Sequence, residues 1–301
     1  MITHFKNSDI DRIKWDKCVL ESDGSMPYAC SWYLDAVSPG WEALIMGDYK
    51  AVMPLPAFRK YGFNYIATPI FLQQLGVFSP DGSLRSDIDS FLNEIPDYYR
   101  LIDLCTAQNT ALKGFKSSQR FDYELDMRES YEALWFSYST DCRRNINISH
   151  RYNQDITEEV RPKEIIALFK SNVGRKAGVI RDVNFKRLEN LMELCVKGGY
   201  GKILGVRSPK GKLLWSIFYI DACNRITLLV TAGSRKSREM KTGYHVIDHI
   251  IRQNAGSVKT LDFAGSSVPS IAVFMKSFGS IRKTYYRLYS NRLPWPVKYL
   301  K

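Results

Sequence analysis

Residues 261–279, LDFAGSSVPSIAVFMKSFG, constrain the fold of this chain more than any other segment. The apolar start predicts a short buried strand, the glycine and serines predict a turn, and residues 269–276 predict a helix. Asp262 falls inside the apolar strand, where a carboxylate is costly unless it is paired or surrounded by donors. Serine hydroxyls and N–H groups at the start of the helix favour an anion or an oxyanion there. The alternative is an aspartate that only ties the turn together.

The length of 301 residues is enough for two domains that each bury a core. An apolar share of 45% with 25% charged residues is typical of a globular protein with a water-exposed surface. The apolar runs are far shorter than the roughly 18–20 residues of a membrane-spanning helix. Residues 1–10 lack the apolar core of a secretory signal, so we expect a cytoplasmic protein without a transmembrane segment.

The charge and the cysteines narrow the possible partners. The 43 Lys and Arg against 31 Asp and Glu give a formal charge of +12, which favours a polyanion such as nucleic acid, a nucleotide-bearing cofactor or a membrane surface. A basic surface that only maintains solubility is the alternative. Six cysteines without a C-x-x-C pair predict reduced thiols and no zinc ribbon. His245 and His249 have H-x-x-x-H spacing, but no third ligand is evident, so we predict no metal site.

The pattern of elements resets near residues 126–130. The first part predicts a mixed sheet with a few helices, and the second predicts a helix pair, an antiparallel three-stranded meander, then helix, strand, helix and strand. We expect helices over residues 10–20, 31–36, 84–95, 129–152, 163–172, 183–197, 244–254 and 269–276. We expect strands over residues 41–46, 51–58, 64–67, 72–78, 100–104, 120–125, 156–160, 202–206, 212–220, 225–231, 261–264 and 281–289.

Residues 232–243, AGSRKSREMKTG, form a basic segment directly before a helix. Cationic side chains, exposed N–H groups and the helix dipole together favour a phosphate at such a place. A solvated basic loop is the alternative. The candidate phosphate ligands are Ser234, Arg235, Lys236, Arg238, Lys241, Thr242 and Gly243.

Two segments carry a resemblance to a known family. Residues 261–279 resemble the D-F-x-G-S … F-K-x-x-F-G signature of FemAB-like aminoacyl transferases, and residues 139–147 are similar to the K-x-R-x-N-I-R-x-A opening of their second domain. These proteins are built from GNAT-type acyltransferase domains, and the predicted order of elements in the second half is that of a GNAT domain. In the phosphate motif of GNAT proteins a glycine stands where this chain has Lys241. Met275 occupies the position of the signature lysine, one residue before Lys276.

The resemblance implies an α+β fold of two GNAT-like domains, residues 1–128 and 129–301, with mixed sheets flanked by helices. The tail, residues 291–301, is expected to return to the first domain. The implied activity is transfer of an acyl or aminoacyl group from an activated ester or thioester to an amine. A non-catalytic GNAT-fold protein that binds a polyanion or a protein partner is the alternative.

The resemblance also assigns roles to residues. Asp262, Ser266 and Lys276 are expected at the acceptor or the oxyanion, and Arg144 is expected to bind substrate. Apart from the resemblance, the aromatic stretch 285–289 predicts a strand from which Tyr285 or Tyr286 points into the acceptor site. No tightly bound cofactor is implied, because acyl-CoA or aminoacyl-tRNA would be the donor. The implied partners are a small-molecule or peptide amine, with tRNA as a further candidate, and the oligomeric state stays open.

Overall fold

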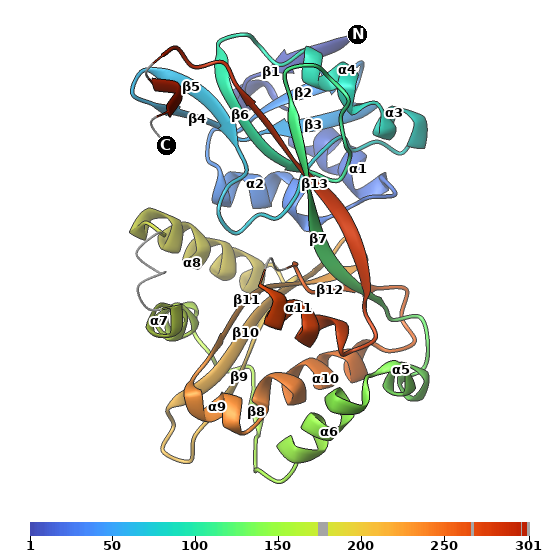
Figure 1. The fold of residues 1–301 in the computed structure, drawn as a ribbon, viewed down its shortest axis with the longest axis vertical. Coiled ribbons are helices and arrows are strands. Elements are labelled where there is room, and N and C mark those ends of the chain that lie inside the picture. Colours follow the sequence, from blue (N-terminus) through green and yellow to red (C-terminus); the bar gives the residue numbers. More distant parts are fainter. Residues whose placement is uncertain (174–179, 266–267, 296, 300–301) are drawn as a thin grey trace. The chain divides into compact units, whose positions relative to one another are not determined.

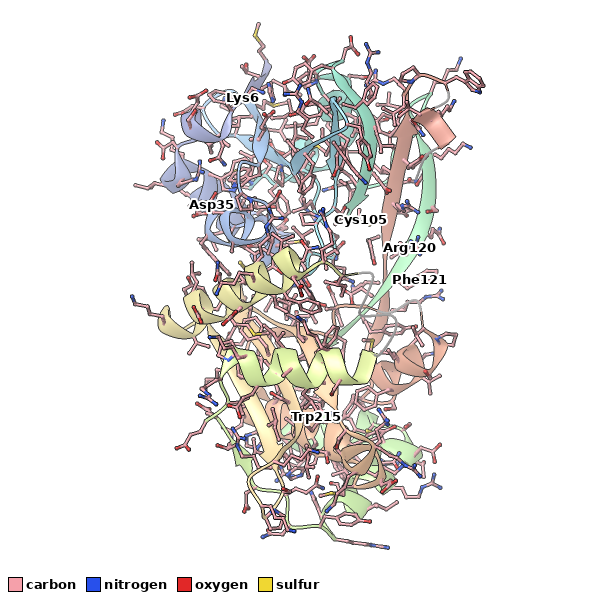
Figure 2. The ribbon with its side chains drawn as sticks, turned by 90° about the vertical axis from the view of Figure 1, so that its left-hand side faces the viewer. Lys6, Asp35, Cys105, Arg120, Phe121 and Trp215 are labelled. Carbon is pink, nitrogen blue, oxygen red and sulfur yellow. The ribbon has the colours of Figure 1, made fainter. Side chains whose placement is uncertain are left out.

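The computed structural model describes residues 1–173, 180–265, 268–295 and 297–299. The chain forms two compact units, one of Met1–Arg120 with Thr284–Lys301 (unit 1) and one of Phe121–Lys283 (unit 2). Arg120 and Phe121, at the boundary between the units, are labelled in Figure 2. The division into two GNAT-like domains, residues 1–128 and 129–301, stays a prediction of the sequence.

Unit 1 contains strands of two sheets (Figure 1). Strands β1 (Ile2–Phe5), β2 (Glu42–Met46) and β3 (Ala51–Leu55) form an antiparallel sheet. In the other sheet, β5 (Phe63–Ala67) runs antiparallel to β4 (Ala57–Lys60) and parallel to β6 (Tyr99–Thr106), and β6 pairs antiparallel with β13 (Ile281–Asn291). The α-helices of unit 1 are α1 (Arg12–Glu21), α2 (Ser31–Val37), α3 (Gly82–Ser86) and α4 (Ile88–Asn93). Short 3-10 helices are η1 (Asn7–Asp9), η2 (Pro27–Ala29) and η4 (Val297–Tyr299).

Three expected elements of unit 1 differ in the structure. The strand expected over residues 51–58 is two strands, β3 and β4, because Pro56 has no N–H to donate between them. The helix expected over residues 84–95 is α3 and α4, and the carboxylate of Asp87 caps α4 by accepting the N–H of Ser90. Residues 72–78 form no strand and make only isolated bridges, at Leu75 and Phe78.

Unit 2 is a sheet with helices on both faces (Figure 1). The strand order is β7 (Lys116–Asp126), β12 (Thr260–Asp262), β11 (Arg225–Gly233), β10 (Leu213–Ala222), β9 (Gly201–Arg207) and β8 (Ile156–Thr157). The β11–β12 pair is parallel and the other pairs are antiparallel, so the sheet is mixed. β9, β10 and β11 are the expected meander.

One face of the unit 2 sheet is covered by α7 (Pro162–Val173) and α8 (Asp182–Lys197). The other face packs against α5 (Tyr131–Ser137), α6 (Thr140–Ser149), α10 (Thr242–Asn254) and α11 (Pro269–Lys276). The core of this second face contains side chains from alternate strand positions, among them Leu125, Ile226, Leu261 and Phe263. Figure 1 shows the two groups of helices on opposite sides of the strands. We name the two sides the α7/α8 face and the α10/α11 face.

Two expectations for unit 2 are corrected. The single helix expected over residues 129–152 is α5 and α6, because Tyr138 is extended and the Ser139 hydroxyl accepts the N–H of Cys142, which starts a new helix. The basic segment is not a plain loop, because it contains the short helix α9 (Arg235–Glu239), capped by Ser234. All six cysteines are free thiols. Among the described residues, the helices are too short or too polar to cross a membrane.

Candidate functional site

A cavity of about 540 Å³ opens on the α10/α11 face of unit 2. Its walls are mostly apolar, and its polar side chains are few. Apolar and aromatic lining comes from Trp215, Leu228, Tyr244, Ile247, Phe263, Ile271, Phe274 and Met275; the other lining residues are Thr231, Gly233, Ser237, Arg238, Lys241 and Gly243. A concave apolar pocket with a few convergent polar groups is the usual form of a small-molecule site.

The cavity lies where two parallel strands diverge. β11 pairs with β12 over residues 225–227 and then continues to Gly233, whereas β12 ends at Asp262. The opposite edge of β11 is paired with β10 along its whole length. Beyond Thr227, the edge of β11 that faces β12 therefore has no strand partner among the described residues. Its backbone groups can bond to an extended ligand.

The rim of the cavity is cationic and carries a helix N-terminus. α10 begins after Lys241, whose φ of 56° is in the left-handed region that favours glycine. The first two N–H groups of α10, those of Thr242 and Gly243, have no acceptor among the described residues. Arg238 and Lys241 add positive charge beside them. This arrangement favours an anion by charge, dipole and hydrogen bonding together.

The structure separates the expected phosphate ligands into two groups. Arg238, Lys241 and Gly243 line the cavity. Among the described residues, the others do not line it: Ser234 caps α9, Arg235 pairs with Glu239 on the exposed side of that helix, Lys236 is exposed, and the buried Thr242 hydroxyl donates to Gln154.

Gln154 holds the start of α10 in place. Its side-chain nitrogen donates to the carbonyls of Ser149 (2.9 Å) and Met240 (3.1 Å), and its oxygen accepts from Thr242. The three contacts tie the end of α6 and the α9–α10 junction together, which fixes the Lys241 backbone. Sequence reasoning missed Gln154, because a single glutamine in a loop gives no local signal.

Asp262 lies on the opposite, α7/α8 face. It is directly paired in register with Thr227 of β11 and Glu124 of β7, whereas its neighbours Leu261 and Phe263 belong to the core on the α10/α11 face. The carboxylate accepts the N–H of Ala264 at 2.7 Å and lies 3.3 Å from the guanidinium of Arg225. The sequence required donors or a partner for this carboxylate, and the Ala264 N–H and Arg225 supply them, but the sequence did not identify Arg225.

Arg225 is shared among several acids. Its Nη1 also lies 2.6 Å from Glu124, and Asp122 is fully buried two residues before Glu124 on the same strand. We name Asp122, Glu124, Arg225 and Asp262 the acidic cluster. Burial and the charge of Asp262 raise the pKa of Asp122 well above its usual value. Burial also raises the pKa of Asp262, opposed by Arg225 and the Ala264 N–H.

The acidic cluster has too few donors for its acceptors. Asp122 Oδ1 accepts the N–H of Tyr123, and the Asp122 carboxyl lies within hydrogen-bonding reach of Asp262, an interaction that requires a proton on one of the two. The hydroxyl of Thr227 is buried without a partner among the described residues. Asp122 was missed from the sequence, because acids alternate with Tyr123 and Leu125 in FDYELD as on a solvent-facing strand.

The remaining candidates are dispersed. Arg144 is an exposed residue of α6 that pairs with Asp141 at 3.0 Å. Lys276 is exposed at the end of α11, and it is the neighbouring Met275 that lines the cavity. Tyr285 is half-buried in the part of β13 that belongs to unit 1. Ser266 lies outside the described residues.

The histidines of α10 make ordinary contacts. His245 Nε2 lies 3.1 Å from the carbonyl of Gln154, and burial lowers the pKa of both His245 and His249. Within residues 1–173, 180–265, 268–295 and 297–299, the structure contains no cluster of three His, Cys, Asp or Glu side chains that could hold a metal ion.

The sequence matches no protein-family model and no curated protein. Solved structures nevertheless share its fold. FemX is 13% identical over 100% of this chain and 99% of its own, with a TM-score of 0.67. A tandem GNAT protein from the clavulanic acid biosynthesis pathway is 12% identical over 98% and 99%, with a TM-score of 0.55. L-PGS from Bacillus licheniformis is 11% identical over 96% and 94%, with a TM-score of 0.52.

These likenesses extend over nearly the whole of each chain. They confirm the predicted fold class, which is α+β with mixed sheets flanked by helices. The chain has the fold of FemX and of tandem GNAT proteins.

Proposed function

We propose that this protein transfers an acyl or aminoacyl group from an activated ester or thioester to an amine. The observation that carries the proposal is the apolar cavity at the divergence of β11 and β12, with the N-terminus of α10, Arg238 and Lys241 at its rim. An apolar interior with an anion-binding rim fits a donor that has a phosphate-bearing head and a long, extended arm. The fold shared with a tandem GNAT protein supports the same class.

Acyl-CoA has the chemistry that fits this cavity. Its pyrophosphate matches the rim, and the amides of its arm match the unpaired edge of β11 beyond Thr227, which would bond them as an added strand does. Aminoacyl-tRNA, which the Fem resemblance implies, is the other donor. Neither donor is a tightly bound cofactor, since each is consumed in the reaction.

The reaction needs alignment, proton removal and oxyanion stabilisation. The acceptor nitrogen attacks the donor carbonyl, the new C–N bond forms, and the C–S or C–O bond breaks with its electrons on the leaving group. One proton of the attacking amine goes to the leaving group. Asp262, Ser266 and Lys276 stay our candidates for the acceptor and the oxyanion, and Arg144 and Tyr285 for substrate binding.

A non-catalytic role as a polyanion-binding protein is the second candidate. Two observations favour it. Lys241 stands with a φ of 56° where the GNAT phosphate motif has glycine, and Met275 stands in the cavity where the Fem signature has lysine. In this case the rim would bind an anion without any group being transferred.

Ligand-dependent thermal unfolding separates the candidates. An acyl-CoA donor site predicts a Tm that rises with the logarithm of CoA or acyl-CoA concentration, because a ligand that binds only the folded state stabilises it. Stabilisation by tRNA without an effect of CoA would favour the aminoacyl-tRNA donor or the polyanion-binding role. Acyl transfer to a panel of amines, followed by mass spectrometry, then distinguishes an enzyme from a binding protein. No stabilisation by any of these ligands would contradict the proposal.

A further inference from the structure

Trp215 forms part of the cavity wall beside the start of α10. It lies on β10, is 6% exposed and is labelled in Figure 2. The indole packs against two glycines. A Cβ added to Gly233 would lie 2.5 Å from Trp215 Cδ1, and one added to Gly243 would lie 3.6 Å from Nε1. The indole nitrogen is therefore next to the first turn of α10.

The indole N–H of Trp215 has no acceptor among the described residues. Other buried tryptophans of this chain are satisfied: Trp15 Nε1 donates to the carbonyl of Ala29 at 2.8 Å, and Trp41 Nε1 donates to Asp35 at 2.7 Å. Of the described side-chain nitrogens, Trp215 Nε1 is not fully enclosed, so its N–H is accessible from the cavity and available to a ligand. An indole can only donate, so the missing partner must be an acceptor atom.

The surroundings of this N–H contain further donors and cations. The N–H groups of Thr242 and Gly243 begin the thirteen-residue helix α10, and Lys241 and Arg238 line the same rim. Of the described residues that line the cavity, none carries a carboxylate. The cavity thus brings together hydrogen-bond donors from β10 and α10 and two positive charges. Such a combination favours the binding of an anionic oxygen.

We propose that Trp215 donates its indole N–H to a phosphate oxygen of the donor, and that it thereby makes the cavity select phosphate-bearing ligands over neutral ones. The identity of the donor in this inference rests on the proposed function, whereas the binding of an anion at Trp215 does not. The rest of the indole is part of the apolar wall. A variant that lacks only the N–H therefore separates the hydrogen bond of Trp215 from its apolar contact with the ligand.

Trp215→Phe removes the N–H and keeps an aromatic ring. We expect its affinity for inorganic pyrophosphate and for CoA, measured by isothermal titration calorimetry, to fall about tenfold, which corresponds to about 1.4 kcal/mol. Pantetheine, which has the arm without phosphate, should bind the variant and the original chain equally. Trp295→Phe, at an exposed position of unit 1, is the matched control and should change no affinity.

A second measurement needs no variant. In the original chain, one of the six indole N–H signals in a ¹H–¹⁵N spectrum should shift when pyrophosphate is added and should not shift with pantetheine. Unchanged pyrophosphate affinity in Trp215→Phe, or indole signals that all stay in place, would overturn the inference. Pyrophosphate binding that depends on Trp215 in a protein without transferase activity would keep this inference and contradict the proposed function instead.

Discussion

The two faces of the unit 2 sheet use the same strands for opposite chemistry. On the α10/α11 face, Leu228 and Phe263 line a cavity whose charges are confined to the rim. On the α7/α8 face, the acidic cluster is packed among buried residues around a single guanidinium. Because side chains alternate along a strand, Asp262 and Phe263 are adjacent in sequence and belong to different faces.

The two faces differ in whether their charged groups are near water or buried. The cavity keeps its cations near water, so an anionic ligand can reach them without an isolated charge being buried first. In the acidic cluster, three carboxyl groups lie around Arg225, and burial with the charge of Asp262 raises the pKa of Asp122, which favours its protonated form. The cavity rim therefore suits the binding of an anionic ligand, whereas the acidic cluster holds its charges inside the fold.

The largest effect should follow from Arg225→Met. It leaves Glu124 and Asp262 without their cation, and breaking a buried ion pair by removing one partner costs about 3–5 kcal/mol. The free energy of unfolding in urea measures this loss. Lys259→Met is the control, since its pair with Asp221 is partly exposed and should contribute about 1 kcal/mol or less. Equal losses in the two variants would show that the acidic cluster is not a desolvated ion pair.

Asp262→Asn tests whether Asp262 does more than support the fold. Removing the charge while keeping the shape should lower the free energy of unfolding by about 1–3 kcal/mol, the usual effect of disturbing a buried hydrogen-bonded group. If Asp262 also handles a proton or orients the acceptor, transfer activity per folded molecule should fall much further. Normal activity in the folded variant would make Asp262 structural.

Asp122→Asn should change the pH dependence of stability. The folded protein raises the pKa of Asp122, so this group favours folding below its unfolded pKa of about 4 and loses that contribution as pH rises towards its folded pKa. The stability of the original chain should therefore fall relative to Asp122→Asn over this range. The control Asp126→Asn should show the opposite sign, because Arg128 lowers the pKa of Asp126. Parallel pH curves for Asp122→Asn and the original chain would contradict the buried-proton account.

The last comparison concerns the two glycines beside Trp215. Gly233→Ala places a Cβ 2.5 Å from the indole, and overpacking of this kind costs about 1–3 kcal/mol. Gly243→Ala meets nothing closer than 3.6 Å and should leave the stability nearly unchanged. Thermal unfolding of the two variants compares them directly. A Gly243→Ala variant as unstable as Gly233→Ala would mean that the cavity wall is tighter than described.

Local patterns in the sequence predicted most of the elements. Periodicity predicted α8, α10 and the meander, because their apolar positions repeat at helix or strand spacing. The errors came from single residues that interrupt a pattern: Pro56 divides β3 from β4, and Ser139 starts α6. An N-cap or a proline inside an apolar pattern is visible in the sequence but is easily outweighed by the pattern around it.

The candidate site was only partly predictable. The basic segment marked the rim, but α9 turns Arg235 and Lys236 away while Arg238 and Lys241 line the cavity. Asp122 and Arg225 join Asp262 only through the pairing of β7, β12 and β11, which no local pattern specifies. Trp215 gave no signal at all, since its unpaired N–H exists only once β10 and α10 are brought together.

Two double variants, each of which removes two cations from residues 235–241, test the central claim most directly. Arg238→Ala with Lys241→Asn removes the cations of the rim, and asparagine tolerates the left-handed backbone at position 241. Arg235→Ala with Lys236→Ala removes the same charge from the exposed side. Affinity for CoA is titrated at two salt concentrations for both variants and the original chain. The account predicts that the first variant loses affinity and salt dependence, while the second retains both. Equal losses, or no loss in either variant, would contradict a phosphate site at this rim.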